Sequence, residues 1–130
     1  MKILIVDDDP DVGRMLGVLL KRKHHAVTTT TSGRVALTLA RDEAFDIVLL
    51  DVRMPEMDGF AVLHALRVQG CAAGIIMLTG QGDVEDAVKA AHLGANDYLP
   101  KPVRLAGLER VLESVTAPRP QSTEPEGDRS

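Results

Sequence analysis

The chain has few aromatic side chains and almost no cysteine. Aromatic residues make up 2% of its 130 residues, tryptophan is absent, and Cys71 is the single cysteine. One cysteine excludes an internal disulfide. No apolar run approaches the roughly 20 residues that a membrane helix requires, and no charged leader precedes an apolar stretch of signal-peptide length. We therefore expect a cytoplasmic protein that does not associate with membranes and whose core is built from Leu, Val, Ile and Ala.

The chain also lacks an excess of basic residues. Its 15 Lys and Arg are interspersed among 19 Asp and Glu, which gives a formal net charge of −4. Such a pattern provides no basic face for a nucleic-acid backbone, so direct nucleic-acid binding by this segment is not expected. With 45% apolar residues the chain suits one domain, which we place at residues 1–117. Pro118, Pro120 and Pro125 lie among polar residues and predict a disordered tail or linker at residues 118–130.

Five short apolar segments alternate with segments of helical periodicity. The predicted strands cover residues 3–6, 26–29, 47–50, 75–78 and 96–99, and the predicted helices begin near residues 10, 32, 60, 82 and 103. This alternation predicts an α/β fold with a parallel sheet, and right-handed crossovers place helices on both faces. We expect a doubly wound, flavodoxin-like fold with five strands in the order 2-1-3-4-5.

Several residues are assigned to helix ends and helix faces. Asp9 precedes Pro10, which is typical of an N-cap followed by proline at the first helical position. Asp83 is expected to cap the fourth helix. The expected inward-facing residues of the last two helices are Val84, Ala87, Val88 and Ala91 in the fourth, and Leu105, Leu108, Val111, Leu112 and Val115 in the fifth.

Acidic residues directly follow two of the predicted strands. Asp7 and Asp8 come after residues 3–6, and Asp51 comes after residues 47–50. In the order 2-1-3-4-5 the first and third strands are neighbours, so these carboxylates converge at the topological switch point, where open α/β sheets bind ligands. A like-charge pair about 4 Å apart costs roughly 4 kcal/mol at an effective dielectric constant of 20. The cluster therefore requires cations or raised pKa values.

Two further strand ends carry residues that suit a phosphate group. Lys101 follows the fifth strand and supplies one positive charge. A divalent ion would neutralise the remaining two negative charges, and an all-oxygen ligand set with room for water suits Mg²⁺. Thr79, at the end of the fourth strand, and the backbone N–H of Gly80 are suited to donate hydrogen bonds to a phosphoryl oxygen. The pattern predicts a metal-dependent phosphate site with Asp51 as the plausible nucleophile.

The motifs at these strand ends, taken together, carry a family resemblance. They are Asp7-Asp8, Asp51 with Met54-Pro55 and Asp58-Gly59 downstream, Thr79-Gly80, and Asp97-Tyr98-Leu99-Pro100-Lys101-Pro102. In this order and spacing they closely resemble the receiver domain of two-component response regulators, the CheY-like domains. The resemblance spans residues 2–115.

The resemblance implies a phosphorylation-dependent signalling switch. Asp51 would accept a phosphoryl group from a sensor histidine kinase, and Asp8, Asp51 and the backbone carbonyl of Arg53 would bind Mg²⁺, with Asp7 acting directly or through water. Thr79 and Lys101 would stabilise the transferred group. No cofactor besides Mg²⁺ is implied, and the only catalysis implied is the chain's own phosphorylation and dephosphorylation.

The same resemblance implies how the signal is read. Thr79 would be drawn toward the phosphoryl group and Tyr98 would turn inward, which reshapes the surface of the fourth helix, fifth strand and fifth helix. The Lys101–Pro102 peptide bond is expected to be cis. Arg53 and Gln81 occupy positions that vary in the family and tune the lifetime of the phosphoryl group. A downstream output domain or effector and a phosphorylation-dependent homodimer stay open.

Other readings of the acidic residues fit less well. A haloacid-dehalogenase-like phosphatase would use Asp7 as its nucleophile with a second acid at Asp9, but Asp11 breaks that pattern. A calcium loop beginning at Asp7 fails because Val12 and Val18 occupy the positions that require Gly and Glu. A degenerate receiver acting only as a protein-binding module would lack the acceptor or the lysine, and both are present. The four histidines lack metal-ligand spacing.

Overall fold

The computed structural model describes residues 1–80 and 84–116. Within these residues the chain forms one parallel sheet in the order β2-β1-β3-β4-β5. Its strands are β1 (Lys2–Val6), β2 (Ala26–Thr30), β3 (Ile47–Asp51), β4 (Gly74–Thr79) and β5 (Asp97–Pro100). Its helices are α1 (Pro10–Arg22), α2 (Gly33–Asp42), α3 (Gly59–Val68), α4 (Val84–His92) and α5 (Leu105–Thr116). The predicted fold class and strand order are confirmed, with strand and helix ends shifted by one or two residues.

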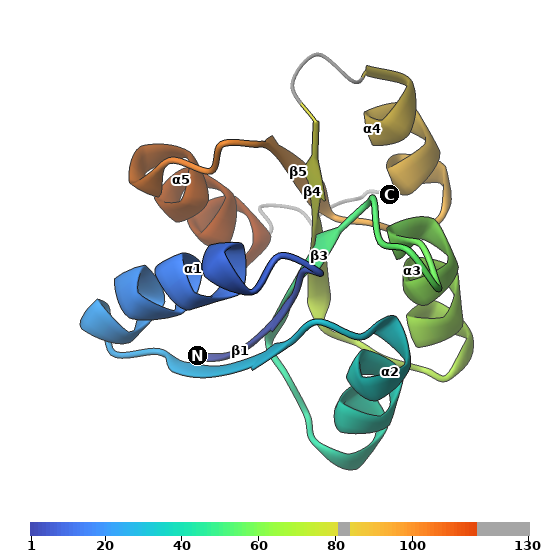
Figure 1. Cartoon of the computed structure of the whole chain (residues 1–130), viewed down its shortest axis with the longest axis horizontal. Coiled ribbons are helices and arrows are strands. Elements are labelled where there is room, and N and C mark those ends of the chain that lie inside the picture. The colour runs from blue at the N-terminus through green and yellow to red at the C-terminus, as the bar shows by residue number, and fades with distance from the viewer. Residues whose placement is uncertain (81–83, 117–130) are drawn as a thin grey trace, which may run out of the picture.

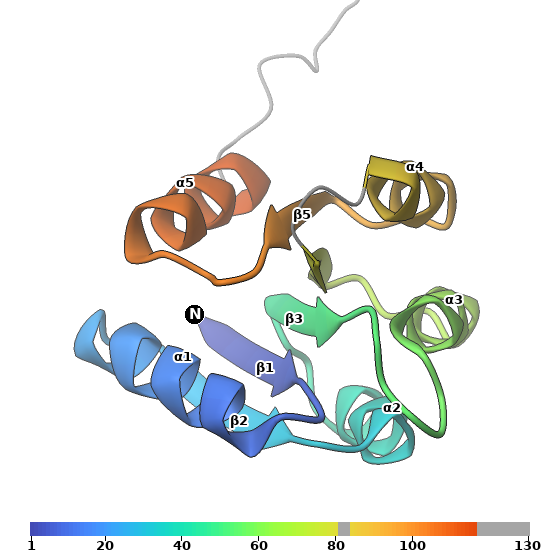
Figure 2. The ribbon, with the colours of Figure 1, turned by 45° about the horizontal axis from the view of Figure 1, so that its top comes forward.

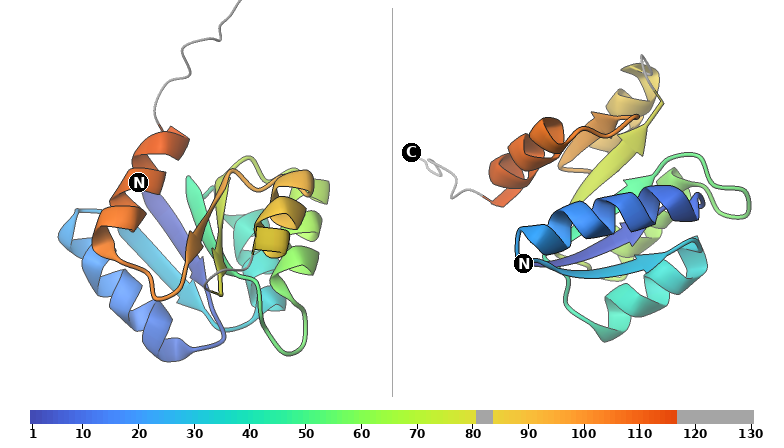
Figure 3. Two further views of the ribbon diagram at one scale, coloured as in Figure 1. Left: turned by 90° about the horizontal axis from the view of Figure 1, so that it is seen from above. Right: turned by 60° about the vertical axis from the view of Figure 1, so that its left-hand side comes forward.

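Helices cover both faces of the sheet. Figure 1 shows α1 and α5 on one side and α2, α3 and α4 on the other, and Figure 3 shows the same layers from two further directions. Alternate residues of each strand face opposite layers, so Ile3 and Ile5 join the core under α1 and α5, while Leu4 and Val6 join the core under the other three helices. The central strand β3 is buried along its whole length. A strand covered on both faces reads as a continuous apolar run, which is the pattern of residues 47–50.

Side-chain caps fix the starts of three helices. The Asp9 carboxylate accepts a hydrogen bond from the Asp11 backbone N–H at 2.9 Å, so its predicted role as the cap of α1 is confirmed. Ser32 caps α2, and Asp58 caps α3 by accepting from the Ala61 N–H at 2.9 Å. Each such cap is worth about 1 kcal/mol. The predicted cap of α4, Asp83, lies outside the described residues.

The predicted inward face of α4 is wrong. Val84 is 71% exposed and Val88 is 53% exposed, whereas the buried members of α4, a helix that lies within the described residues, are Asp86 and Ala90. The sequence pattern favoured the valines because they are the most hydrophobic residues of the segment. The helix instead turns toward the sheet a face that carries one carboxylate. Leu105 was also expected to point inward, but it is the first residue of α5 and is 38% exposed, while Val103 before it is buried.

Arg67, near the end of α3, ties three segments together. Its guanidinium donates hydrogen bonds to the backbone carbonyls of Cys71, Ala73 and Gly94 at 2.8–3.0 Å. It also donates to the Asn96 side-chain oxygen at 2.9 Å, which in turn accepts from the backbone N–H at the second residue of β4. These bonds fasten the segment between α4 and β5 to the rest of the fold. None of the helices within the described residues is long and apolar enough to cross a membrane.

Candidate functional site

The carboxyl ends of the strands bring the predicted site residues to one edge of the sheet. Val6 pairs with Leu50 in the β1–β3 register, so Asp7 follows β1 beside Asp51 at the end of β3. Thr79 at the end of β4 pairs with Pro100 in β5, and Lys101 is the next residue. Figure 2 shows β1 and β3 pointing the same way, toward the connections that lead to α1 and α3. The register therefore gathers residues that are distant in the chain.

Three carboxylates form a compact cluster at this edge. One oxygen from each of Asp7, Asp8 and Asp51 lies within 4.8 Å of the others. Asp7 and Asp51 are buried and Asp8 is exposed. Backbone N–H groups hold the two buried carboxylates, because Asp9 donates to Asp7 at 2.9 Å and Arg53 donates to Asp51 at 3.3 Å. The cluster thus has two fixed members and one that faces solvent.

Lys101 bridges the two buried carboxylates. Its Nζ lies 2.8 Å from Asp7 Oδ2 and 3.2 Å from Asp51 Oδ1. The Lys101 backbone N–H donates to the Thr79 carbonyl at 2.7 Å, which fixes the start of the segment after β5. The Lys101–Pro102 peptide bond is cis, as expected. The lysine is therefore in direct contact with the residue predicted to be the nucleophile.

The electrostatics of the cluster follow from its burial. Burial raises the pKa of the Asp51 carboxyl to about 6, and the Asp7 charge adds to this rise while Lys101 opposes it. Burial alone would lower the pKa of the Lys101 ammonium, but its contacts with Asp7 and Asp51 outweigh that effect and the pKa rises. One lysine therefore does not compensate the charge of the three carboxylates.

The donor set fits a divalent cation that prefers oxygen ligands. The carboxylates of Asp7, Asp8 and Asp51 converge, and Asp8 leaves one side open to water. Asp7 Oδ2 makes no well-aligned hydrogen bond to any atom of the described residues, although the Lys101 ammonium lies 2.8 Å away. A buried carboxylate oxygen in that state is suited to a cation or to water bound by one. The residues present therefore fit Mg²⁺.

An open cavity of about 360 Å³ begins beside Asp8. It is lined by the start of α2, from Ser32 to Arg34, and by the segment after β3, from Met54 to Met57. This cavity therefore adjoins the exposed side of the carboxylate cluster, at Asp8. Asp51 itself is 4% exposed, so neighbouring residues cover nearly all of its surface.

The two predicted switch residues differ in burial. Thr79 is buried at 2% exposure, next to β3, whereas Tyr98 is 47% exposed. A second cavity of about 210 Å³ lies beside Tyr98, between α4 and β5, and is lined mainly by Ala87, Ala90, Ala91 and Ala95. The tyrosine is therefore outward in this structure, and an alanine-lined cavity adjoins it.

Two features of the site were not predicted from the sequence. The Arg53 side chain, considered only as a variable position, donates to the Asp86 carboxylate of α4 at 2.6 Å. Gly59 follows the α3 cap and lies so near β3 that a Cβ there would collide with the Asp51 carbonyl oxygen and with Val52. The Asp58-Gly59 motif had signalled Gly59 as part of a family pattern, but not this physical reason. No sequence signal points to the Arg53–Asp86 pair.

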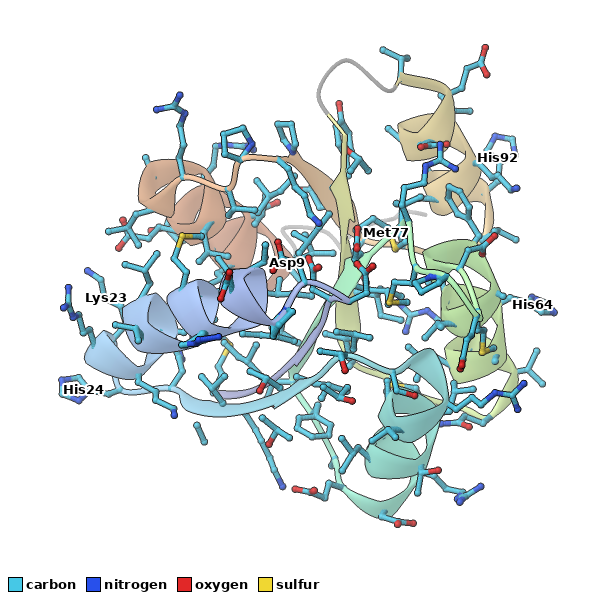
Figure 4. All side chains as sticks on the ribbon, viewed as in Figure 1. Asp9, Lys23, His24, His64, Met77 and His92 are labelled. Carbon is cyan, nitrogen blue, oxygen red and sulfur yellow. The ribbon has the colours of Figure 1, made fainter. Side chains whose placement is uncertain are left out.

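Residues set aside during the sequence analysis lie away from the cluster. Figure 4 labels His24, His64 and His92, which lie on different helices or helix ends at the rim of the molecule. All three are exposed. Asp9 serves as the α1 cap, and Cys71 is a half-buried free thiol after α3. The absence of metal-ligand spacing among the histidines therefore agrees with their separation in space.

Comparison with known proteins identifies the family. The model of the response regulator receiver domain matches residues 3–113. The chain belongs to the response regulator receiver domain family. This receiver domain is 42% identical over 115 residues to the transcriptional regulatory protein ZraR of Escherichia coli K12, a match that covers 88% of the chain and 26% of ZraR. The chain thus spans about a quarter of the length of that curated relative.

Solved structures agree with this assignment. The chemotaxis protein CheY4 of Vibrio cholerae superposes on the receiver domain with a TM-score of 0.82 and 34% identity, covering 88% of this chain and 97% of CheY4. The receiver domain of the sensor histidine kinase PA1611 of Pseudomonas aeruginosa gives a TM-score of 0.77 at 33% identity, covering 87% of this chain and 94% of that one. The latter structure has a magnesium ion coordinated in its active-site cleft.

Proposed function

We propose that this receiver domain is a Mg²⁺-dependent phosphorylation switch in which Asp51 accepts a phosphoryl group from the phosphohistidine of a sensor histidine kinase. The observation that carries the proposal is the buried Asp51 carboxylate, which lies 3.2 Å from Lys101 Nζ and within a cluster of three carboxylates. The exposed cavity beside Asp8 supplies the route of access.

The transfer requires a nucleophile and groups that stabilise charge. An Asp51 carboxylate oxygen attacks phosphorus, the phosphorus–nitrogen bond of the phosphohistidine breaks, and the imidazole nitrogen keeps the electron pair. Lys101 and the Thr79 hydroxyl stabilise the negative charge on the transferring oxygens. Mg²⁺, held by Asp8, Asp51 and the Arg53 backbone carbonyl with Asp7 acting directly or through water, would supply further charge stabilisation when bound.

The signal is read at the surface formed by α4, β5 and α5. In the proposed response Thr79 moves toward the phosphoryl group and Tyr98 turns inward, toward the alanine-lined cavity beside it. A nearly complete swing between two states requires differential contacts worth about 5.5 kcal/mol. Phosphoryl contacts with Lys101, Thr79 and the metal are charge-assisted and are of the kind that supply such energies.

The partners of the whole protein are proposed on the same basis. A histidine kinase is the phosphodonor, residues 1–117 are the receiver domain, and 118–130 are a linker or tail. Relatives such as ZraR are longer than this chain, which supports an output domain or effector as the downstream partner. Homodimerisation on phosphorylation is a further proposal. The segment itself acts in the cytoplasm without binding nucleic acid or membrane, and it catalyses only its own phosphorylation and dephosphorylation.

The alternative phosphatase function has no support in the site. It requires Asp7 as nucleophile, but Asp7 has a fully buried side chain and its two oxygens face the Asp9 N–H and the Lys101 ammonium. None of the comparisons reported above involves a phosphatase. The receiver function is therefore the one that the geometry supports.

The test is incubation with a small acyl phosphate and Mg²⁺, followed by intact-mass measurement. We expect the chain to gain one phosphoryl group and to lose this gain in Asp51→Asn or when a chelator removes the metal. Asp42→Asn, which removes an exposed carboxylate at the end of α2, is the matched control and should label like the natural chain. Stable labelling of Asp51→Asn would refute the assignment. Loss of activity in Asp7→Asn together with many turnovers of the natural chain would favour the phosphatase.

A further inference from the structure

Arg67, near the end of α3, holds the segment that connects α4 to β5. Arginine has five N–H groups, and all five of those of Arg67 donate hydrogen bonds. Nε and Nη2 both donate to the Gly94 carbonyl, at 3.0 and 2.8 Å, and Nη2 also donates to Asn96 Oδ1 at 2.9 Å. Nη1 donates to the carbonyls of Cys71 and Ala73 at 2.9 and 2.8 Å. The guanidinium is therefore fixed by oxygen atoms from two segments of the chain.

Asn96 extends this attachment into the sheet. Its Oδ1 accepts from the Ile75 backbone N–H at 2.8 Å, and its own backbone N–H donates to the Ile75 carbonyl at 2.8 Å. Ala95 closes the end of α4, because its N–H donates to the Ala90 carbonyl at 3.0 Å. The end of α4, the start of β5 and the start of β4 are thus joined at Arg67 and Asn96, a place that we call the Arg67 junction.

The two ends of α4 lie at opposite edges of the sheet. The helix follows β4, which ends at the edge that carries Asp51, and it returns to the start of β5 at the opposite edge. At its first turn, Asp86 lies 2.6 Å from the Arg53 guanidinium, and the Arg53 backbone N–H donates to Asp51 Oδ1 at 3.3 Å. The N-terminal end of α4 therefore adjoins the site, whereas its C-terminal end adjoins the Arg67 junction.

We expect the Arg67 junction to respond little to a new charge at Asp51, for two reasons. Its hydrogen-bond acceptors are backbone carbonyls and a side-chain amide, which are all neutral. In addition, β4 has 6 residues and spans about 20 Å, more than twice the Debye length of about 8 Å at physiological ionic strength. An acyl phosphate replaces the single negative charge of the Asp51 carboxylate with about −1.5 to −2. That change acts mainly at the edge of the sheet that carries the site.

We propose that the Arg67 junction is the pivot of the switch. It holds the C-terminal end of α4 and the start of β5 in both states, and a phosphoryl group on Asp51 displaces the N-terminal half of α4 about this fixed end. The proposal rests on the proposed function, since it requires that phosphoryl group. Arg67 acts as a positioning residue, because it binds the segments before β4 and β5 rather than the carboxylate cluster. The pivot also fixes the start of the strand that carries Tyr98, so this side chain turns against a stationary backbone.

The test is hydrogen exchange of single backbone amides in the full chain with Mg²⁺, with and without beryllofluoride as the phosphoryl mimic. In the natural chain, the mimic should change exchange at Val88 and Lys89 by about fivefold or more, the scale of one hydrogen bond. Exchange at Ala95 and Asn96, which lie at the Arg67 junction, should stay within about twofold of its value without the mimic.

Arg67→Gln should remove the pivot. Without the mimic, exchange at Ala95 and Asn96 should be at least about tenfold faster, because hydrogen bonds to a charged group are lost. The mimic should then change exchange at these two amides by about fivefold as well, whereas a merely structural loss would leave their rates the same with and without it. Asn96→Ala should behave in the same way if Arg67→Gln folds poorly. Asn96→Asp keeps the side-chain acceptor and should behave like the natural chain.

Arg41→Gln is the matched control, because it removes an exposed arginine from the last turn of another helix, α2. It should respond to the mimic as the natural chain does, and all four variants should still be labelled at Asp51 by a small acyl phosphate. The pivot is refuted, and the switch function stands, if the mimic binds at Asp51 but does not change Val88 and Lys89 more than Ala95 and Asn96. The same holds if Arg67→Gln confines the response as the natural chain does. If neither the mimic nor a phosphoryl group binds at Asp51, the proposed function fails and the pivot fails with it.

Discussion

Asp51 is held in its site at the expense of folding stability. Its pKa is raised from 3.8 to about 6, chiefly by burial, so the folded chain binds a proton at this carboxyl more tightly than the unfolded chain does. A raised folded-state pKa means that the free energy of unfolding falls as the pH rises from about 4 through 6. The metal-free protein therefore has a lower free energy of unfolding when Asp51 is ionised, which is the state that nucleophilic attack requires.

Asp51→Asn should therefore stabilise the metal-free receiver at neutral pH. The shift corresponds to a gain on the order of 1–3 kcal/mol at pH 7.5, which should disappear at about pH 3 and below, where Asp51 is mostly protonated in both states. Urea unfolding in the presence of a chelator, at about pH 7.5 and about pH 3, measures both values. Added Mg²⁺ should raise the stability of the natural chain, as ligand linkage requires, and should have much less effect on the variant. An equal difference at both pH values would contradict the burial effect.

The site residues differ in how far the sequence could reveal them. Asp7, Asp8, Asp51 and Lys101 were predictable because the carboxyl ends of parallel strands meet at one edge. The structure brings them within contact distance, as predicted. The Arg53–Asp86 pair was not predictable, because the two residues lie 33 positions apart in the chain. Arg53 lies in the irregular segment after β3, and Asp86 lies in α4, a helix with a weak apolar pattern. A side chain's partner across two elements depends on packing that no local pattern specifies.

At the scale of elements, the close contact between α3 and β3 explains why position 59 requires a glycine. Gly59 begins α3, and its N–H donates to the Val52 carbonyl at 2.8 Å. A Cβ at this position would overlap the Asp51 carbonyl oxygen and the Val52 backbone. The obstacles are backbone atoms, which cannot rotate away as a side chain would. Any larger residue must push the start of α3 from the strand that carries Asp51.

Gly59→Ala should consequently destabilise the fold and impair phosphorylation together. Overpacking of this kind costs about 1–3 kcal/mol, and the displaced Asp51 backbone should slow labelling by a small acyl phosphate. Gly17→Ala, inside α1, is the control, because its Cβ would lie 3.8 Å from Val27 Cγ1 of β2, which is an ordinary van der Waals contact. Alanine there should be neutral or stabilising by up to about 1 kcal/mol. Urea unfolding and the labelling rate measure both effects, and unchanged labelling in Gly59→Ala would show that the backbone adjusts elsewhere.

The misassigned face of α4 has a physical cause at the same scale. Alanine contributes little to a hydrophobic pattern, so the segment offers two overlapping stripes, one with Val84 and Val88 and one with Asp86 and Ala90. Hydropathy favours the valines. The structure buries the other stripe because Arg53 from a neighbouring segment partners the carboxylate. Amphipathic periodicity therefore located the helix but not its orientation.

At the scale of the whole molecule, the fold was predictable because several constraints agree. Strands that are buried on both faces read as apolar runs, and helices between them impose right-handed crossovers. Few topologies satisfy both, and the observed order β2-β1-β3-β4-β5 is among them. The sheet edge strand β2, which is only partly buried, gave the weakest sequence pattern. The sequence pattern of the strands was thus strongest at the centre of the sheet and weakest at its edge.

The extent of the folded unit gives a final prediction. Val115, in the last turn of α5, packs against the core under α1 and α5, and its Cγ1 lies directly against Gly74 at the start of β4. A chain that ends at residue 116 retains this contact and should keep its free energy of unfolding within about 0.5 kcal/mol, because residues 118–130 have the composition of a linker. A chain that ends at residue 113 loses the contact and should lose about 1–2 kcal/mol.

Urea unfolding of the two shortened chains beside the full one measures these differences, and Asp51 labelling reports on the site. Both shortened chains should still label, since the family match ends at residue 113 and the carboxylate cluster lies at the opposite end of the strands from Gly74. A chain ending at 116 that unfolds at much lower urea concentration would show that later residues belong to the folded unit. We therefore expect the boundary of the folded unit to depend on Val115, whose loss should lower the stability of the fold but leave labelling at Asp51 intact.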